Sequence, residues 1–421
     1  MDIASLIQSR LSETYELHRR YVNPQFVRVL EVIGFNRNYC RARGATLIDE
    51  KGREVLDFLA GFGVFNIGRN HPVVAQVIQD MLHCSAPNLV QMDVGVVSGL
   101  LAEALARITP TELNVTLGAL SVNGNEEFRS RNEPLLPGCI PVPFNDLNAL
   151  EAALSAGDAA AFIAEPIQGK GVFVPDDDYF PGVRRLCDRY GTLFIADEVQ
   201  TGFGRTGRMF ALNHWDVTPD ILVVSKALSG GYIPLGAIIT KRAIHSRVFD
   251  CMDRCFAHSN TFGQNNLAMA AGLATLDVIE QENLIDRSAR LGNYLMKGLN
   301  DMAARYELLH QVRGKGLMIG IQFGPPRSLS LKTGWKLLHK MNEELFCQMI
   351  TIPLLERHHI LTQVAGHGLD TVKILPPLII DTADADRFLN AMDDVLKDAH
   401  KFPGSAWTTV KNLGLRTAKT A

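Results

Sequence analysis

Short apolar segments alternate with helix-like segments through the middle of the chain, and this alternation most narrowly limits what the chain can fold into. Between the first two apolar segments, hydrophobic residues recur at helical spacing over 180–190 and stop at a glycine. Apolar strands that alternate with helices are buried on both faces of a mostly parallel sheet, so the pattern predicts an α/β fold. The predicted strands cover residues 160–165, 192–197, 220–225 and 236–240.

Polar residues stand at the ends of three of these strands. Glu165, Asp197 and Lys226 each close or follow an apolar run. Because ligands of open α/β sheets bind outside the carboxyl ends of the strands, we expect these side chains to meet at one site. Lys226 alone has two explanations: a surface lysine whose stem covers apolar residues, or a partly desolvated amine that acts as a nucleophile.

The hydrophobic pattern divides the chain into four parts. We expect an N-terminal segment over 1–55, a large domain over 56–308, a smaller α+β domain over 309–400 and a flexible tail over 401–421. In the smaller domain the pattern predicts strands at 316–323 and 371–380 and helices at 333–349 and 384–400.

Composition argues against several classes of protein. A net charge of −3 gives no electrostatic reason to expect nucleic acid or an anionic membrane as a partner. No apolar run approaches the ~18 residues that span a bilayer, and the start of the chain lacks a signal-peptide core. Seven scattered cysteines favour reduced thiols and a cytoplasmic location. Cys251 and Cys255 have no second pair at ligand spacing, so we expect helix packing there and no metal site.

Residues 202–207, GFGRTG, formally match the dinucleotide-binding pattern G-x-G-x-x-G. That pattern requires a helix that opens directly after the glycines. Here the glycines begin five residues beyond Asp197, and the following RMFALNHWDVTPD shows no long amphipathic face. We therefore expect a loop fixed by Arg205 and Arg208, and no nicotinamide or flavin site.

Asp197 and Lys226 together suggest a different cofactor. A buried carboxylate keeps a heterocyclic nitrogen protonated, because an opposite charge favours the charged form, and a lysine amine can form an imine with a carbonyl. Pyridoxal phosphate requires both groups. The spacing alone leaves a buried Asp197–Lys226 ion pair as an equal alternative.

Several sequence motifs match those of one known protein family, in the same order along the chain. They are LAGFGVFNIGRNHP (59–72), AEPIQGKGVFVP (164–175), FIADEVQTGFGRTG (194–207), TPDILVVSKALSGGYIPLGA (218–237), HSNTFGQNNLA (258–268) and LPPL (375–378). With these motifs, the chain closely resembles the class III (ornithine- and GABA-type) aminotransferases from about Asn36 to Lys397. The resemblance implies a fold type I pyridoxal-phosphate-dependent transferase, with a mostly parallel central sheet in a large domain and a smaller α+β C-terminal domain.

The resemblance also implies a role for each matching residue. Lys226 would form the Schiff base with the cofactor (the internal aldimine), and Asp197 would pair with the pyridine nitrogen. Gln200 would lie near the ring hydroxyl, and Glu165 near the active face of the cofactor. Thr261 would bind the phosphate of the neighbouring subunit's cofactor, which implies a homodimer. Without the resemblance, Thr261 would be read as an N-cap and Glu165 as a strand-end carboxylate.

One segment of the family is absent from this sequence. TELNV (111–115) is followed at once by TLGALS (116–121). Relatives carry several dozen residues between these motifs, including a Ser-Gly-Thr/Ala-Glu-Ala turn and an aromatic-His-Gly segment. Loss of the phosphate-binding amides would remove several charge-assisted hydrogen bonds of ~1.5–3 kcal/mol each. A degenerate homologue, an internal deletion and replacement by another segment all explain the absence.

Two lysines also depart from the family pattern. Lys373, in TVKILPPL, stands where many relatives have an arginine that binds the substrate carboxylate, and Lys170 stands where some have a glutamate. A lysine lacks the planar two-pronged fit of a guanidinium. Weaker carboxylate binding, a substrate without an α-carboxylate and a purely structural lysine are all consistent with Lys373.

The expected function is transfer of an amino group from an amino acid or amine donor to an oxo-acid or aldehyde acceptor. Another pyridoxal-phosphate reaction on the same scaffold (racemisation, aminomutation or decarboxylation) is one alternative. A catalytically impaired or non-catalytic homologue, which persists as a folded partner or dimerisation module, is the other.

Overall fold

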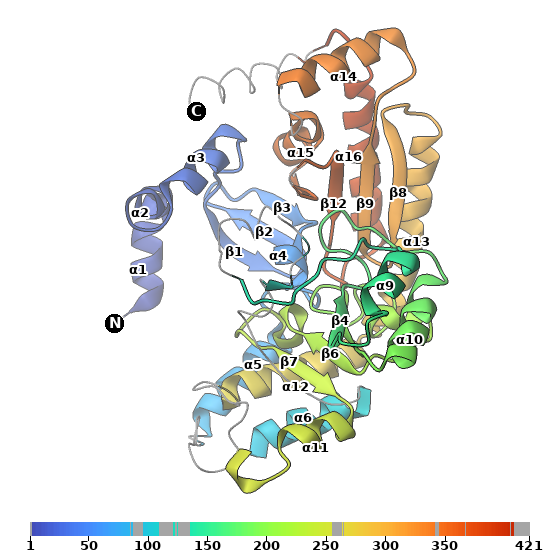
Figure 1. Ribbon diagram of the computed structural model, residues 1–421. Helices are drawn as coiled ribbons and strands as arrows, with labels where there is room; N and C mark the ends of the chain where they lie inside the picture. The colour runs from blue at the N-terminus through green and yellow to red at the C-terminus, as the bar shows by residue number, and fades with distance from the viewer. Residues whose placement is uncertain are drawn as a thin grey trace.

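The computed structural model describes residues 2–84, 86, 96–108, 121–122, 124, 135–254, 263, 265–341, 345–366, 368–404 and 406–407. Within these residues the strands form three four-stranded sheets, and the helices pack around them in two lobes that share one continuous apolar core (Figure 1). The Val115–Thr116 junction, Cys255, Thr261 and the tail beyond Trp407 lie outside the described residues.

The central sheet confirms the α/β prediction. β4, β5 and β6 are parallel, and β7 is antiparallel to β6. All four strands lie where the sequence predicts them, slightly shortened at their ends. In spatial order they are β4 (Ala161–Ala164), β5 (Leu193–Asp197), β6 (Ile221–Val224) and β7 (Ala237–Thr240).

Helices cover this sheet as the hydrophobic periodicity predicts. α10 (Tyr179–Tyr190) buries Phe180, Val183 and Leu186, and it ends at Gly191, whose φ of +68° is left-handed. α12 (Asn266–Gln281) packs against α5 (Pro72–His83), α6 (Val96–Ile108) and the turn after β6. No helix in the described part of the chain combines the length and the apolar character that crossing a membrane requires.

The second lobe is built on an antiparallel sheet. Its order is β11 (Gln363–Val364), β12 (Thr371–Ile374), β9 (Met318–Phe323) and β8 (Leu309–Lys315). α13 (Leu284–Ala303) packs on β8 and β9, and α16 (Thr382–Ala399) packs on α13. The predicted helix over 384–400 is thereby confirmed within two residues.

Two predicted elements of this lobe are wrong. The single helix over 333–349 is two helices, α14 (Leu329–Met341) and α15 (Leu345–Glu356). α14 is amphipathic and lies at the surface, whereas α15 is buried on almost every side, so the two cannot continue one apolar face. The strand over 371–380 ends at Ile374, because the two prolines at 376 and 377 cannot donate to a strand ladder.

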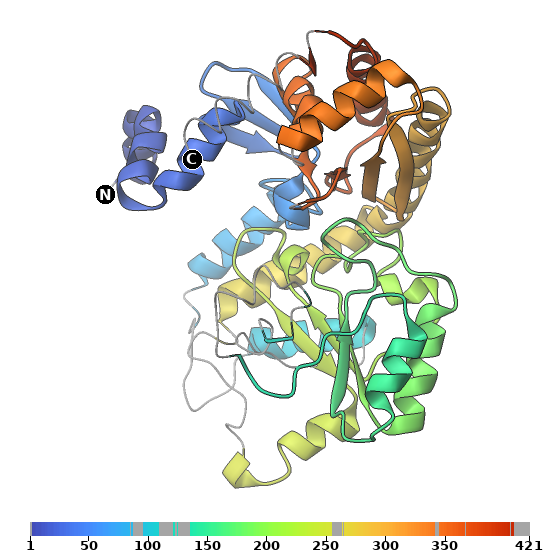
Figure 2. The same cartoon turned by 45° about the horizontal axis from the view of Figure 1, so that its top comes forward.

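The third sheet pairs strands from residues 39–57 with a strand at residues 360–361, and the sequence analysis did not predict it. β1 (Tyr39–Arg43), β2 (Thr46–Asp49) and β3 (Glu54–Asp57) form an antiparallel meander, and β3 pairs in parallel with β10 (Ile360–Leu361). Ahead of it, α1 (Ile3–Arg10), α2 (Thr14–Tyr21) and α3 (Pro24–Val32) extend away from the body as an arm (Figure 2).

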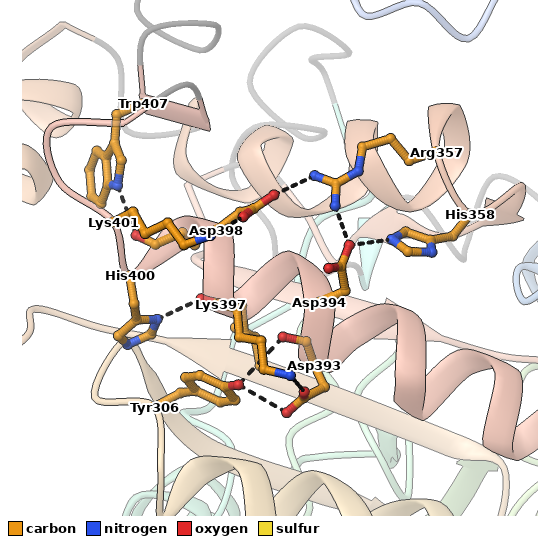
Figure 3. Close-up of polar contacts among 12 residues, drawn as sticks. Tyr306, Arg357, His358, Asp393, Asp394, Lys397, Asp398, His400, Lys401 and Trp407 are labelled. Atoms are coloured by element: carbon orange, nitrogen blue, oxygen red, sulfur yellow. Dashed lines mark hydrogen bonds and ion pairs between the residues drawn. The ribbon is translucent and has the colours of Figure 1, made fainter.

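Ion pairs secure the C-terminal end of α16 (Figure 3). Arg357, which follows α15, bonds to Asp394 and, at 2.6 Å, to Asp398 of α16. Beyond the helix, Trp407 Nε1 donates to the carbonyl of Ala399 at 2.8 Å. This hydrogen bond attaches Trp407 to the lobe.

Candidate active site

A cavity of about 450 Å³ lies at the carboxyl ends of β4, β5 and β6, where the strand order predicts a ligand. Both lobes contribute to it. The lining residues are Phe62, Glu165, Gly169, Lys170, Asp197, Val199, Gln200, Lys226, Gln363, Val364, Ala365, Gly366 and Lys373. The structure therefore brings together five of the six predicted site residues, and the sixth, Thr261, lies outside the described residues.

Lys226 enters the cavity from a tight turn. It opens the 3₁₀ turn η3 (Lys226–Ser229) with a φ of +43°, a left-handed value that is uncommon for a residue with a side chain. Ser225 Oγ, which donates to the carbonyl of Leu235 at 2.8 Å, braces this turn. Burial lowers the pKa of the Lys226 ammonium, and the charges of Asp197 and Glu165 partly oppose that effect. The amine is therefore partly desolvated.

Asp197 closes β5 and faces the same cavity. Burial raises the pKa of its carboxyl, while a hydrogen bond from the N–H of Val199 at 3.0 Å and the charge of Lys226 act in the opposite direction. Asp197 and Lys226 are both described, and they make no ion pair within 4.0 Å. The two side chains thus face the same cavity without direct contact between their charged groups, which argues against a buried Asp197–Lys226 ion pair.

Gln200 supplies a polar atom without a partner. Its Nε2 donates to the carbonyl of Phe62 at 3.1 Å, and its buried Oε1 has no hydrogen-bond partner among the described residues. A Cβ on Gly169 would come within 2.8 Å of this oxygen. A buried acceptor normally has a donor, so Gln200 Oε1 fits a ligand that presents a hydrogen-bond donor, such as a hydroxyl group or an N–H group.

Glu165 and Lys373 are connected through the backbone of Gly169. Glu165 Oε2 accepts the N–H of Gly169 at 2.5 Å, and Lys373 Nζ donates to its carbonyl at 2.8 Å. Burial raises the pKa of Glu165, and the nearby charge of Asp197 raises it further. Burial lowers the pKa of Lys373 to about 8; the charge of Lys226 lowers it as well, while Glu165 opposes the shift. Lys373 is 5% exposed, so its ammonium acts in a poorly solvated site.

Sequence reasoning missed the part of the cavity that comes from distant segments. Phe62 lies in LAGFGVF, a motif that signals the family without assigning a role to this ring. Residues 363–366 follow β10 and carry no motif that could have identified them. They reach the cavity because β11 pairs with β12 and thereby lies beside Lys373.

The glycine-rich loop at 202–207 does not resemble a dinucleotide site. After the glycines the chain forms turns and the short 3₁₀ helix η2 (Ala211–His214) in place of a long helix. Arg205 is fully buried and holds this loop, as predicted, whereas Arg208 is exposed and has no hydrogen bond to a described residue. The loop-fixing prediction is therefore correct for Arg205 alone.

The expectation for Cys251 is also corrected. It is exposed and lies between α11 (Arg242–Val248) and the 3₁₀ turn η4 (Met252–Arg254), so it takes no part in helix packing. Among the residues that the structure describes, no group of three or more His, Cys, Asp or Glu side chains could hold a metal ion.

Comparisons with known proteins agree with the geometry. The sequence pattern of the family described as Aminotransferase class-III matches residues 31–119 and 114–396. A putrescine aminotransferase from Pectobacterium atrosepticum is 36% identical over 448 positions, covering 94% of this chain and 90% of that protein. Aminotransferase PigE from a Serratia species is 32% identical over 459 positions, covering 93% of this chain, and the chain spans about half (54%) of its length. Both alignments are longer than the 421 residues here, so the relatives carry residues that this chain lacks.

A solved structure shows the same arrangement of elements. The amine transaminase from an uncultivated Pseudomonas species, in a PLP-bound internal aldimine form, is similar with a TM-score of 0.72 and 28% sequence identity. The similarity covers 85% of this chain and 94% of that one.

Proposed function

This chain belongs to the class III aminotransferases, fold type I enzymes whose cofactor is pyridoxal phosphate, and from that premise we propose its reaction. We propose that it moves an amino group from an amino acid or amine donor to an oxo-acid or aldehyde acceptor. The observation that supports this most directly is the cavity shared by Lys226, Asp197 and Gln200, whose Oε1 is a buried acceptor without a partner among the described residues.

These residues fit the aldehyde and ring end of the cofactor. When bound, pyridoxal phosphate supplies a ring that takes up the electron pair left on the substrate carbon. In our proposal Lys226 Nζ would hold the cofactor covalently, and the same amine, whose pKa burial lowers, would serve as the group that moves the substrate proton. Asp197 keeps the ring nitrogen protonated, and Gln200 Oε1 accepts a hydrogen bond from the ring hydroxyl. Thr261 is proposed for the phosphate on the family resemblance alone.

Borohydride trapping tests the proposal. The purified chain is incubated with excess pyridoxal phosphate, its visible absorption is recorded, and the sample is reduced and digested for mass spectrometry. A visible imine band with an adduct mapped to Lys226 supports the site. The absence of both a band and an adduct at any lysine favours the non-catalytic homologue. A two-substrate exchange assay run in both directions then separates transamination from racemisation, aminomutation or decarboxylation.

The residues that line the cavity favour amino-group donors without an α-carboxylate. No arginine is among the residues that line the cavity in the described part of the chain, and Lys373 already bonds to the carbonyl of Gly169. The relative from Pectobacterium atrosepticum is named for putrescine, a diamine, which agrees with this wall. We therefore propose primary amines as the better donors. The Gly169 carbonyl takes one of the three N–H donors of Lys373, and we assign the other two to a weaker, point-charge contact with the carboxylate of the oxo-acid acceptor.

Replacement of Lys373 by alanine should separate the two substrates. We expect KM for a 2-oxo acid acceptor to rise ~10-fold or more, because a charge-assisted hydrogen bond is worth about 1.5–3 kcal/mol. KM for a simple diamine donor should change little. Steady-state kinetics with a diamine and an amino acid as alternative donors measure both effects. Equal weakening of carboxylate-bearing and plain-amine substrates would make Lys373 a structural residue.

The acceptor affinity should depend on pH through Lys373. Its ammonium is charged below a pKa of about 8 and neutral above it, so attraction for a carboxylate is present at pH 7 and fades as the pH rises through 8. We expect KM for the 2-oxo acid to rise as the pH passes that point and to level off near the KM of the Lys373→Ala variant. Arginine stays charged, so Lys373→Arg should remove the pH dependence. An unchanged profile in that variant would contradict the assignment.

A non-catalytic member of the family is the second candidate, and the direct Val115–Thr116 junction favours it. Without the missing segment, the phosphate loses backbone donors and the ring loses its stacking partner. Such a chain would keep the fold and a dimer interface without turnover. The trapping experiment separates this candidate from the first.

Three further assignments are part of the proposal. The homodimer rests on the family role of Thr261, and size-exclusion chromatography with light scattering tests it. The cytoplasmic location is supported by the described cysteines, which are all unpaired. A division between the large and small domains at 308/309 agrees with the end of α13 and the start of β8.

A further inference from the structure

The turn over 168–173 has a strained backbone on the substrate side of the cavity. Val172 is fully buried with a φ of +56°, although a β-branched residue rarely adopts the left-handed region. Gly171 precedes it with a φ of +90°. Glycine adopts a positive φ freely, whereas Val172 keeps a left-handed φ only where neighbouring groups enforce it. The turn must therefore be held from outside.

Arg313 of β8 holds this turn. Its Nη2 donates to the carbonyl of Gly171 at 2.7 Å, and its Nε lies 3.1 Å from the carbonyls of both Gly171 and Val172. The guanidinium carbon lies 4.4 Å from the centre of the Phe173 ring, within range of a cation–π contact. One planar side chain thus contacts three consecutive residues of the turn.

The backbone of Gly320, in the adjacent strand β9, packs directly against the turn. A Cβ at this position would lie 3.0 Å from Val172 Cβ and 3.2 Å from the carbonyl oxygen of Gly171. The turn therefore packs on the bare backbone of the small-lobe sheet. Arg313 and Gly320 therefore contact the same two residues, Gly171 and Val172.

The same turn presents two residues to the cavity. Gly169 donates to Glu165 and accepts from Lys373, and Lys170 lines the cavity beside it. If Val172 relaxed to an ordinary φ, both bonds at Gly169 would shift, and with them the charged groups that face the substrate. Arg313 is not among the lining residues, so it would act only through this turn.

We propose that Arg313 is a positioning residue of this enzyme: it holds the strained 168–173 turn on the small-lobe sheet and thereby sets the substrate-facing wall formed by Gly169, Lys170 and Glu165. Its catalytic consequence rests on the proposed function. Cofactor attachment at Lys226 should not depend on it, because Asp197 and Lys226 are placed by β5 and the turn after β6.

Two substitutions with one shared target test the proposal. Arg313→Lys keeps the charge and removes the planar fork, and Gly320→Ala keeps Arg313 and crowds the turn. Arg305→Lys is the matched control, because Arg305 is 55% exposed and pairs with Asp393 on α16, away from the cavity. Circular dichroism checks that each variant is folded.

Hydrogen–deuterium exchange of the chain without added cofactor is the first measurement. Val172 N–H bonds to the carbonyl of Gln168 at 3.1 Å and Gly169 N–H to Glu165, so both are protected. We expect at least about tenfold faster exchange of peptides covering 168–173 in both test variants, with peptides covering 193–200 unchanged. Wild-type rates in both variants would overturn the proposal, whatever the cofactor result.

Kinetics and trapping with pyridoxal phosphate are the second measurement. We expect KM for substrate to rise about tenfold to a hundredfold in both test variants, with the borohydride adduct at Lys226 retained. Faster exchange with unchanged KM would overturn the positioning role and leave a purely structural arginine. If the wild-type chain forms no adduct, the proposed function fails, while the exchange data still decide whether Arg313 holds the turn.

Discussion

Replacement of Lys226 by alanine is expected to abolish covalent attachment of pyridoxal phosphate and to lower kcat by ~10³-fold or more. The lysine would serve twice, as the amine that holds the cofactor and as the base that moves the substrate proton, and positioned acid–base catalysis alone typically contributes about 10²–10⁴-fold. Removing the side chain leaves the fold intact, because its ammonium forms no ion pair with Asp197 and faces the cavity.

Reduction with borohydride followed by peptide mapping, together with kcat at saturating substrates, measures this effect. Lys170→Ala is the matched control, since Lys170 also lines the cavity but does not follow a strand of the central sheet. The control should keep its adduct at Lys226. A persistent visible band and adduct in Lys226→Ala would place the Schiff base on another lysine and refute the assignment.

Replacement of Arg205 by methionine is expected to lower the free energy of unfolding by ~4 kcal/mol. Arg205 is fully buried, and burial lowers the pKa of its guanidinium to about 9. It donates to the carbonyl of Leu317 at 3.0 Å, to that of Pro376 at 2.5 Å and to the side chain of Asn66. Methionine fills much of the volume but leaves these acceptors without a donor, and each unsatisfied buried group costs about 1–3 kcal/mol.

Urea denaturation followed by circular dichroism measures the loss as a shift of the midpoint at constant slope. Arg208→Met is the control, because Arg208 is exposed three residues further along the same loop, and it should change stability by less than about 0.5 kcal/mol. A similar urea midpoint for the two variants would show that the buried guanidinium of Arg205 does not stabilise the fold. The experiment needs neither cofactor nor substrate, so it is independent of catalytic competence.

Much of the large lobe could be predicted because its signals are local. The apolar runs of β4, β5 and β6 are each continuous, and the residues at their carboxyl ends share one sheet edge by geometry. That is why Glu165, Asp197 and Lys226 could be assigned to one cavity. The prediction failed at the helix over 333–349, where a surface face and a core face follow each other without a breaker that the periodicity could reveal.

The sequence by itself determined the α/β class, the positions of the central strands along the chain and the charged residues at their ends, because each depends on residues that are neighbours in the chain. Tertiary structure alone decided the pairing of β3 with β10, the bond between Lys373 and Gly169 and the contacts of Arg313 with the 168–173 turn. These join segments that are more than a hundred residues apart and leave no periodic signal in either partner. The physical reason is that every residue has a backbone carbonyl that can accept a hydrogen bond, whatever its side chain. The sequence at Gly169 and Gly171 therefore gives no sign of the lysine and arginine that donate to them.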